Sequence, residues 1–306
     1  MKGEIIMINA AGVVKTFGDF RALDGLSLHV KRGSVYGLVG PNGAGKTTII
    51  KTIMGVYRQD EGEVRIDSEL TYENKEIKKK VICISDDLFF YPTYSIMETA
   101  KLYAGIYPEW SWEKFEKMKE VFKIDTKKKV RRLSKGMQKQ VAFWLGLASQ
   151  PSVMILDEPV DGLDPVMRRN VWKLMLQAVA EKEMTVLVSS HNLRELEDVC
   201  DYVGILHEGR VVIEKSLDDI RGNIHKLQVA FSDRGFPDAL DTKLEILNKT
   251  GFGSVNMLIV KGDSDEIVRL VNEYNPVVCD ILPLTLEEVF IYELGGMGYE
   301  FETILL

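Results

Sequence analysis

The sequence predicts an α/β domain built around a parallel sheet, with a helical subdomain inserted in it, followed by a small α+β domain. Three observations support this prediction. The mostly apolar runs 34–39, 153–156 and 185–189 are typical of strands buried on both faces of a parallel sheet. Segments with helical spacing follow or separate these runs. The length of 306 residues is about twice the ~150 residues expected of one domain.

The first domain is expected to cover residues 1–222 as a series of strand and helix units. A strand over 34–39 precedes a glycine-rich loop and a helix over 46–55. Later, a helix over 165–181 separates the second and third apolar runs. Because successive strands are joined through helices, the sheet should be parallel.

The helical subdomain is expected over about residues 88–150. Apolar residues recur at helical spacing over 95–107 and 113–123. Ser95 and Ser111 stand at the positions of N-caps for these two helices. This part of the chain is therefore predicted to be an insert of helices.

The second domain is expected over residues 223–306, where the alternation of strand and helix stops. Gly251 and Gly253 mark a hairpin turn. A segment of this length can form a small α+β domain. Within it we expect strands over 226–231, 255–260 and 277–282, and helices over 263–274 and 284–294.

Composition and charge exclude several classes of protein. Hydrophobic residues make up 45% of the chain and charged residues 28%, which is typical of a folded globular protein. The 39 basic and 46 acidic residues give a net charge of −7, so binding of nucleic acid through overall charge is not expected. The longest apolar runs, such as 141–148, are far shorter than the ~20 residues that cross a bilayer.

The N-terminal residues and the cysteines predict a cytoplasmic protein. Residues 1–11 have no long apolar core followed by a small-residue cleavage site, so no secretion signal is expected. Cys83, Cys200 and Cys279 stand far apart without a Cys-x-x-Cys pair. This spacing favours neither a disulfide framework nor a cysteine-rich zinc site.

The strongest motif lies between the strand predicted over 34–39 and the helix that follows it. It matches G-x-x-x-x-G-K-[ST], the phosphate-binding P-loop. Its glycines let successive backbone N–H groups face a phosphate, and the helix adds its positive end. We expect Lys46 to neutralise the β- and γ-phosphates and the Thr47 hydroxyl to bind magnesium. The residues expected to bind nucleotide are Gly40, Pro41, Asn42, Gly43, Ala44, Gly45, Lys46, Thr47 and Thr48.

Two carboxylates end a later predicted strand. Asp157 and Glu158 follow the apolar run 153–156. Because magnesium prefers oxygen ligands, Asp157 is expected to bind the metal. Glu158 lies past the strand end, where it is expected to act as general base on a water aligned with the γ-phosphorus.

A second helix whose N-terminus could bind an anion is expected to begin near residue 134. Ser134, Lys135 and Gly136 precede an apolar helix that runs toward Ser149. A serine, a cation and a glycine at a helix N-terminus favour an anion. One chain thus has two helix N-termini that favour a phosphate, one after the P-loop and one near residue 134. This suggests that each of them completes a site in another copy of the chain.

Together these motifs resemble those of an ATP-binding cassette (ABC) transporter ATPase over roughly residues 5–222. By this resemblance, Asp164 is the D-loop aspartate and His191 is the switch histidine that touches the γ-phosphate. The family signature L-S-G-G-Q would bind the ATP held by a partner copy, and here lysine and methionine replace a glycine and the glutamine. The corresponding residues are Leu133, Ser134, Lys135, Gly136 and Met137.

The resemblance also assigns two residues outside these motifs. It implies that Phe17 stacks on adenine, which needs only a flat apolar face. Where the family has a glutamine that senses the metal, this chain has Asp86. The chain departs from the family pattern there, and the Asp86 carboxylate is expected to join Thr47 and Asp157 in the metal site.

The resemblance implies an ATPase, with ATP and Mg²⁺ as cofactors, that drives a separate integral-membrane permease. Two cassettes, in a homodimer or a heterodimer, would sandwich each ATP between the P-loop of one and the signature of the other. A carboxy-terminal domain ending in residues 283–290 resembles ABC-2-like exporters of drugs, antibiotics or polymers more than importers. The protein would then lie peripherally on the inner face of the cell membrane.

Other functions are open at this point. A soluble ABC ATPase of DNA repair, translation or iron–sulfur assembly would share the motifs, but the long coiled coil of repair members and the second cassette of translation factors are missing. A GTPase would need Asn-Lys-x-Asp, and residues 248–251 lack the aspartate.

Two surface segments allow more than one interpretation. The basic run 127–132 has no interleaved aromatic residues, which favours a solvated loop over a nucleic-acid groove. An aromatic cluster lies where family members dock a helix of their membrane subunit, although such a cluster can also be core. Its members are Phe89, Phe90, Tyr91 and Tyr94, with Tyr103 and Tyr107 beyond them.

Overall fold

The computed structural model describes residues 5–232, 236–289 and 291. The chain forms two compact units, Met1–Glu214 and Lys215–Leu306. The division precedes α7 (Leu217–Asn223), which packs against β11 (Ile224–Ala230) in the second unit. The helix α7 therefore spans the position, after residue 222, where a boundary was expected.

A six-stranded sheet forms the centre of the first unit. Its strands are β3 (Val35–Val39), β6 (Val81–Ile84), β7 (Val153–Asp157), β8 (Thr185–Ser190), β9 (Tyr202–His207) and β10 (Arg210–Ser216). The strand order is β10-β9-β3-β8-β7-β6. Neighbouring strands from β9 to β6 run parallel to each other. Every residue of β3, β7 and β8 is buried because both faces of the sheet are covered, so the predicted α/β class is confirmed.

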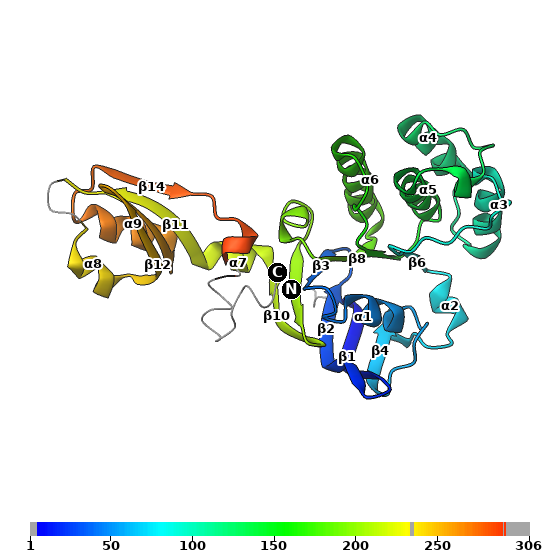
Figure 1. Ribbon diagram of the computed structural model, residues 1–306, viewed down its shortest axis with the longest axis horizontal. Helices are drawn as coiled ribbons and strands as arrows, with labels where there is room; N and C mark the ends of the chain where they lie inside the picture. The colour runs from blue at the N-terminus through cyan, green and yellow to red at the C-terminus, as the bar shows by residue number, and fades with distance from the viewer. Residues whose placement is uncertain (1–4, 233–235, 290, 292–306) are drawn as a thin grey trace. The chain divides into compact units, whose positions relative to one another are not determined.

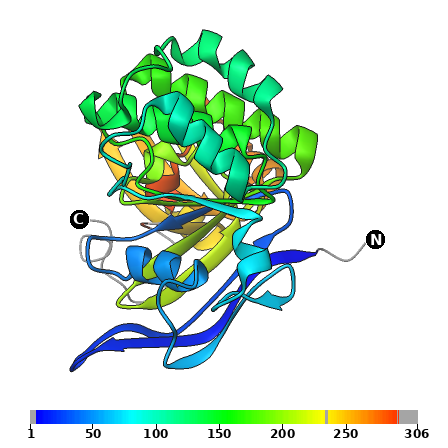
Figure 2. The same cartoon turned by 90° about the vertical axis from the view of Figure 1, so that its right-hand side faces the viewer.

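A second sheet lies on one side of the parallel sheet (Figure 2). Its strands are β1 (Ile6–Phe17), β2 (Phe20–Lys31), β4 (Glu61–Ile66) and β5 (Glu69–Leu70), in the order β2-β1-β4-β5. Helix α1 (Lys46–Ile53) packs between the sheets, because Ile49, Ile50 and Ile53 share one hydrophobic cluster with residues of both. A short helix, α2 (Lys75–Lys78), precedes β6. The P-loop is therefore anchored between two sheets.

Helices cover the other side of the parallel sheet (Figures 1 and 2). They are α3 (Ile96–Ile106), α4 (Trp112–Phe122), α5 (Lys135–Ala148) and α6 (Pro165–Lys182), with the short turns η1 (Val130–Arg132) and η2 (Leu193–Glu195). Ser95 and Ser111 cap α3 and α4 as predicted, each accepting a backbone N–H three residues on. A Cβ on Gly146 of α5 would lie 3.3 Å from Ile82 and 3.4 Å from Met154, so this helix packs closely on β6 and β7.

Trp144 is the centre of the helical layer. Its ring stacks on Phe115 at 4.8 Å and on Phe122 at 5.8 Å between centroids. Its indole Nε1 donates to the carbonyl of Phe115 at 2.7 Å. Because Trp144 and Phe115 are fully buried, these contacts hold α4 against α5.

The second unit is a small α+β domain. Its sheet, in the order β12-β13-β11-β14, is antiparallel throughout, and it packs with two helices around its own apolar core. The elements besides β11 are α8 (Asp238–Lys243), β12 (Glu245–Phe252), β13 (Val255–Lys261), α9 (Ser264–Asn272) and β14 (Val278–Leu282).

The sequence patterns missed part of this second unit. Strand β12 was not expected, and Gly251 pairs with Asn256 in its ladder instead of lying in the turn. Only Gly253, with φ 65°, takes the left-handed conformation that the tight turn requires. Residues 286–289 are helical, and residues 290 and 292–294 of the helix expected over 284–294 lie outside the described residues. Among the described helices, none has the length and apolar character needed to cross a bilayer.

We predict that Trp144→Ala lowers the free energy of unfolding by about 3–5 kcal/mol, since it opens a cavity in the aromatic cluster. Trp144→Phe keeps a stacked ring and loses only the indole hydrogen bond to the Phe115 carbonyl, so it should cost only about 0.5–1.5 kcal/mol. Urea unfolding followed by circular dichroism measures both. Equal, small effects of the two substitutions would show that Trp144 does not organise the helical layer.

Candidate functional site

The P-loop joins the carboxyl end of β3 to the start of α1. Its glycines are required by the backbone: Gly43 has φ 86° and Gly45 has φ 111°. A Cβ on Gly40 would lie 2.3 Å from the carbonyl oxygen of Leu206, and one on Gly45 would lie 2.9 Å from that of Ala22. Side chains at these positions would push the loop off the sheet. The glycines therefore allow the loop to wrap tightly ahead of the α1 N-terminus.

Lys46 is the first residue of α1, and the residue is 6% exposed. It donates to the carbonyls of Gly40 at 2.5 Å and Pro41 at 3.2 Å. Its Nζ lies 3.6 Å from Oε1 of Glu158. Burial lowers the pKa of Lys46, while the facing Glu158 and Asp157 act in the opposite direction. The loop thus holds one buried positive charge against Glu158, the predicted base just past the end of β7.

Thr47 and Asp157 place oxygen atoms side by side. The Thr47 hydroxyl donates to Oδ2 of Asp157 at 2.9 Å, and the Ser189 hydroxyl donates to Oδ1 at 2.5 Å. Asp157 is 4% exposed at the end of β7. Both carboxylate oxygens are therefore oriented by hydroxyl groups from neighbouring elements, and all of the donor atoms are oxygens, which suits magnesium.

Glu158 lies immediately past the end of β7 in a left-handed backbone conformation, with φ 48°. Its N–H donates to the carbonyl of Ser189 at 3.2 Å. Its second carboxylate oxygen, Oε2, lies 2.9 Å from Nδ1 of His191. The carboxylate is therefore held between the Lys46 ammonium and the His191 imidazole. The geometry brings together the two residues predicted to be catalytic.

Asp86 lies between β6 and the helical layer and has a partner that the sequence patterns did not indicate. Its Oδ1 accepts from Nζ of Lys139 at 3.1 Å. The same ammonium donates to the carbonyl of Glu158 at 2.8 Å. The charge of Asp86 is thus paired within the protein, beside the position expected to bind metal.

A pocket of about 370 Å³ brings most of these predicted residues together. Asp86, Asp157 and Glu158 line it with P-loop residues from Pro41 to Thr48, although Ala44 and Gly40 are not part of its surface. Phe20 lines the pocket and Phe17 does not. The two phenylalanines face each other across the β1–β2 hairpin, and Phe17 packs edge to face on Tyr57 at 5.3 Å. The aromatic side chain at this pocket is therefore Phe20.

One further group of ligand atoms within the described ranges lies close enough to hold a metal ion. It comprises Glu158, Asp161 and His191, whose donor atoms all lie within 4.8 Å of one another. Asp161 follows β7 in the segment that leads to α6. This group overlaps the Glu158–His191 pair and is separate from the Thr47–Asp157 pair.

The signature residues stand at the start of α5. Ser134 is the N-cap, and its hydroxyl accepts from the N–H of Met137 at 3.3 Å. Ser134 and Lys135 are exposed, whereas a Cβ on Gly136 would lie 2.6 Å from the carbonyl of Gly162. Leu133 accepts from the Gln138 side chain at 2.9 Å through its carbonyl. The helix start is thus packed on one side and open to solvent at the serine and the lysine.

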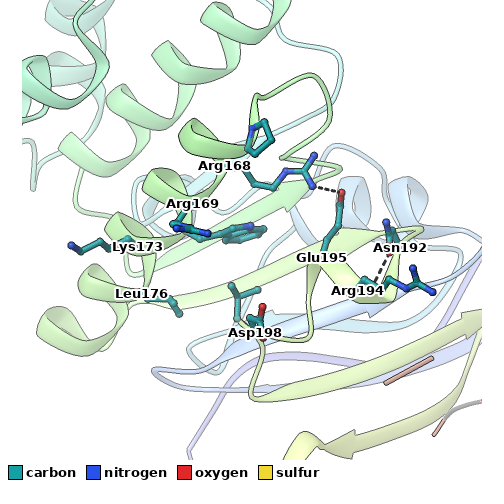
Figure 3. A pocket seen from close by; sticks show the side chains of 11 residues that line it. Arg168, Arg169, Lys173, Leu176, Asn192, Arg194, Glu195 and Asp198 are labelled. Atoms are coloured by element: carbon teal, nitrogen blue, oxygen red, sulfur yellow. Dashed lines mark hydrogen bonds and ion pairs between the residues drawn. The ribbon is translucent and has the colours of Figure 1, made fainter. Parts of the chain in front are cut away.

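Asp164 caps the next helix and accepts from the N–H groups of Val166 and Met167 at 3.1 and 3.0 Å. A pocket of about 560 Å³ lies between that helix, α6, and the segment after His191 (Figure 3). Within it Arg168 donates to Oε1 of Glu195 at 3.0 Å, and burial raises the pKa of Glu195. These contacts connect the helix that begins after Asp164 to the segment that carries His191.

Three residues at the site escaped the sequence analysis. Ser189 ends the buried run 185–189, so its position opposite Asp157 follows only from the pairing of β7 with β8. Lys139 lies in an apolar helix, where a single lysine facing inward could have been noticed from its spacing. Phe20 lies three residues after Phe17, and the resemblance to the family assigned the stacking role to Phe17 alone.

Comparison with known proteins agrees with this geometry. A family model described as "ABC transporter" matches residues 23–161. "ABC transporter ATP-binding protein YtrB" of Bacillus subtilis (strain 168) is 31% identical over 290 residues, which is 95% of this chain and 99% of that protein. "Bacitracin transport ATP-binding protein BcrA" of Bacillus licheniformis is 32% identical over 74% of this chain and 76% of its own length.

A solved structure described as "Structure of ATP binding subunit of ABC transporter" has a TM-score of 0.66 and 28% identity, over 70% of this chain and 92% of its own. A nucleotide-free cassette from an ABC transporter has a TM-score of 0.60 and 26% identity, over 69% of this chain and 92% of its own. The family match and the relative that spans almost the whole chain lead to one conclusion. The chain belongs to the ATP-binding proteins of ABC transporters.

Proposed function

We propose that this chain hydrolyses ATP with Glu158 as general base, and that it thereby drives a separate membrane permease. One observation carries the assignment of the base. The Glu158 carboxylate has one oxygen 3.6 Å from the Lys46 ammonium and the other 2.9 Å from the His191 imidazole, at a pocket lined by the P-loop. A carboxylate at such a position can orient and deprotonate a water.

The residues of the pocket suggest how binding prepares hydrolysis. The triphosphate of ATP would bring an anion to Lys46, which now faces Glu158. With Lys46 engaged by phosphate, Oε1 of Glu158 is free to accept the proton of the attacking water. His191 would keep the other carboxylate oxygen in place through Nδ1. The Phe20 ring, 63% exposed at the pocket, offers a flat face for the base.

Magnesium would be held by Thr47 and Asp157. Their oxygens are adjacent at 2.9 Å, and Ser189 orients the second oxygen of Asp157. The ion supplies positive charge that stabilises the phosphate oxygens. Asp86 lines the same pocket, and its bond to Lys139 reduces the negative charge that it adds there.

Two cassettes would form each complete site. Ser134 and Lys135 are exposed at the N-terminus of α5, where backbone N–H groups and the helix dipole favour an anion. In a head-to-tail pair they would close over the ATP held by the partner's P-loop. Solved structures of dimeric ABC cassettes share this fold, at 24% identity and a TM-score of 0.63 in one case.

We further propose that the coupled permease is an exporter of an antibiotic, drug or polymer, and that the cassette sits on the inner face of the membrane. Relatives at 30% identity or more include proteins described as serving bacitracin transport and linearmycin resistance. A candidate docking surface is the exposed part of the aromatic cluster, Phe89 at 79% and Tyr91 at 50% exposure, whereas Phe90 is buried. Aromatic side chains of this kind are enriched at protein interfaces.

We predict that Glu158→Gln retains ATP affinity but lowers turnover by roughly 10²-fold or more, because the amide cannot accept the proton. With Mg-ATP, this variant should accumulate as a dimer in size-exclusion chromatography. Lys46→Ala is the matched control: it should lose ATP binding itself, since the phosphates lose their buried counter-charge. A monomeric Glu158→Gln variant with full activity would overturn the assignment of the base.

We predict that Ser134→Arg binds ATP almost as well as the wild type but does not dimerise, because the larger cation occupies the space of the partner's phosphate. Ser134→Ala is the control, since it adds neither bulk nor charge and, as a lost N-cap, should cost only about 1 kcal/mol in stability. Calorimetric ATP titration and size-exclusion chromatography of Glu158→Gln carrying each change make the comparison. If both double variants still dimerise, the signature does not meet a partner's nucleotide.

We predict that Phe89→Asp uncouples transport from hydrolysis. In the source organism, loss of the gene should increase susceptibility to a peptide antibiotic such as bacitracin, and the wild-type gene should restore resistance. Phe89→Asp should fail to restore it while keeping ATPase activity of the purified chain, since a charge would disrupt an apolar interface. Val56→Asp, at another exposed position (65%), should behave as wild type. Susceptibility unchanged by loss of the gene would contradict export of this class.

A further inference from the structure

Lys139 is a buried cation of the signature helix that none of the predicted roles uses. It lies on α5, just after the signature, and is 5% exposed. A lysine is almost never buried this far unless its charge is paired. Its ammonium has two acceptors, Oδ1 of Asp86 at 3.1 Å and the carbonyl oxygen of Glu158 at 2.8 Å. One side chain therefore connects the signature helix with the loop after β6 and with the end of β7.

The bond to Glu158 acts on a backbone conformation that needs support. Glu158 has φ 48°, which is costly for a residue with a side chain. Its N–H is held by the Ser189 carbonyl at 3.2 Å, from the neighbouring strand β8. Its carbonyl is held by Lys139, from the helical layer. The direction in which the carboxylate leaves the backbone thus depends on both the sheet and the signature helix.

The bond to Asp86 keeps the Lys139 ammonium charged at this place. The Lys139 side chain is 6% exposed and the Asp86 side chain 67%. The Asp86 carboxylate therefore loses little hydration by pairing, and it supplies the negative charge that the buried ammonium requires. A glutamine, which the family pattern would place at this position, supplies no charge. The pair accounts for the aspartate at residue 86 in terms of this chain's own lysine.

We propose that Lys139 is a positioning residue that couples the signature of this chain to its own catalytic carboxylate. The inference rests on the proposed function, in which Ser134 meets the partner's ATP and Glu158 acts on the ATP of its own P-loop. A displacement of α5 when Ser134 engages the partner's nucleotide is transmitted through the Lys139 ammonium to the Glu158 peptide group. Lys139 thus connects the two ATP sites of the pair and makes their turnover cooperative.

The test is Lys139→Met, which keeps the length and apolar stem of the side chain and removes the ammonium. Lys139 does not line the P-loop pocket. Affinity for a non-hydrolysable ATP analogue, measured by calorimetry, should therefore stay within about 2-fold of the wild-type value. Turnover should fall about 10- to 100-fold, because a displaced Glu158 carboxylate no longer aligns the attacking water. The Hill coefficient for ATP in the ATPase assay should fall from above 1, with a ceiling of about 2 for two sites, to about 1.

Three further variants make this result specific. Lys139→Arg keeps the charge and several donors, and should preserve most of the Hill coefficient. Lys101→Met removes an exposed lysine from α3 of the same layer and should leave both turnover and the Hill coefficient unchanged. Asp86→Asn should lower turnover less when combined with Lys139→Met than it does alone, because the two side chains act as a pair.

The outcomes separate the inference from the proposed function. If Glu158→Gln is inactive but Lys139→Met has the wild-type turnover and Hill coefficient, the coupling role of Lys139 is wrong and the proposed function stands. If Glu158→Gln is fully active, the proposed function fails first. Circular dichroism melting checks folding. Should Lys139→Met not fold, Lys139→Gln is the deciding variant. Its side chain is polar but shorter and uncharged, so it cannot replace both bonds of the ammonium. An unchanged Hill coefficient in that variant would overturn the proposal.

Discussion

The structure depends on the pairing of charges that are buried at the carboxyl edge of the parallel sheet. Lys46, Lys139 and Asp157 are exposed by only 6%, 5% and 4%, and an unpaired ion at such a depth would cost several kcal/mol. Each is instead held by groups from a different part of the chain: loop carbonyls for Lys46, hydroxyls for Asp157, and a carboxylate and a carbonyl for Lys139. The loops and helices that surround the edge are thus fixed relative to one another by the requirements of buried charge.

Glu158 is where these connections meet. Its N–H binds β8, its carbonyl binds the signature helix, and its two carboxylate oxygens face the P-loop lysine and the histidine after β8. A residue with so many partners can hold a left-handed backbone conformation that would otherwise be unfavourable. A movement of any neighbouring element therefore changes the position of this carboxylate, which is the property that a nucleotide-driven ATPase requires.

The helical layer is built differently from the edge that it contacts. Its interior is apolar and aromatic, with Trp144 stacked between Phe115 and Phe122. It meets the edge of the sheet through the hydrogen bond from the Lys139 ammonium to the Glu158 carbonyl and through the close approach of Gly136 to Gly162. A closely packed layer can transmit a displacement without deforming internally. This arrangement suits the proposed function, in which Ser134 meets the partner's ATP and Glu158 acts on the ATP of its own P-loop.

Features that depend on residues close together in the chain could be predicted from the sequence: the parallel sheet, the P-loop, the carboxylates at the end of β7 and the capped helices of the insert. Backbone sterics alone require glycine at Gly43 and Gly45, and apolar runs alone predict strands covered on both faces. Which distant side chains meet follows only from the way the chain folds in three dimensions. Ser189 reaches Asp157 through strand pairing, Phe20 rather than Phe17 faces the pocket from a hairpin, and Lys139 pairs with Asp86 across the gap between a helix and a loop. Strand β12 escaped prediction for a related reason: its residues pair with β13 along a ladder, and cross-strand contacts of this kind leave a weaker trace in the local sequence than a buried apolar run does.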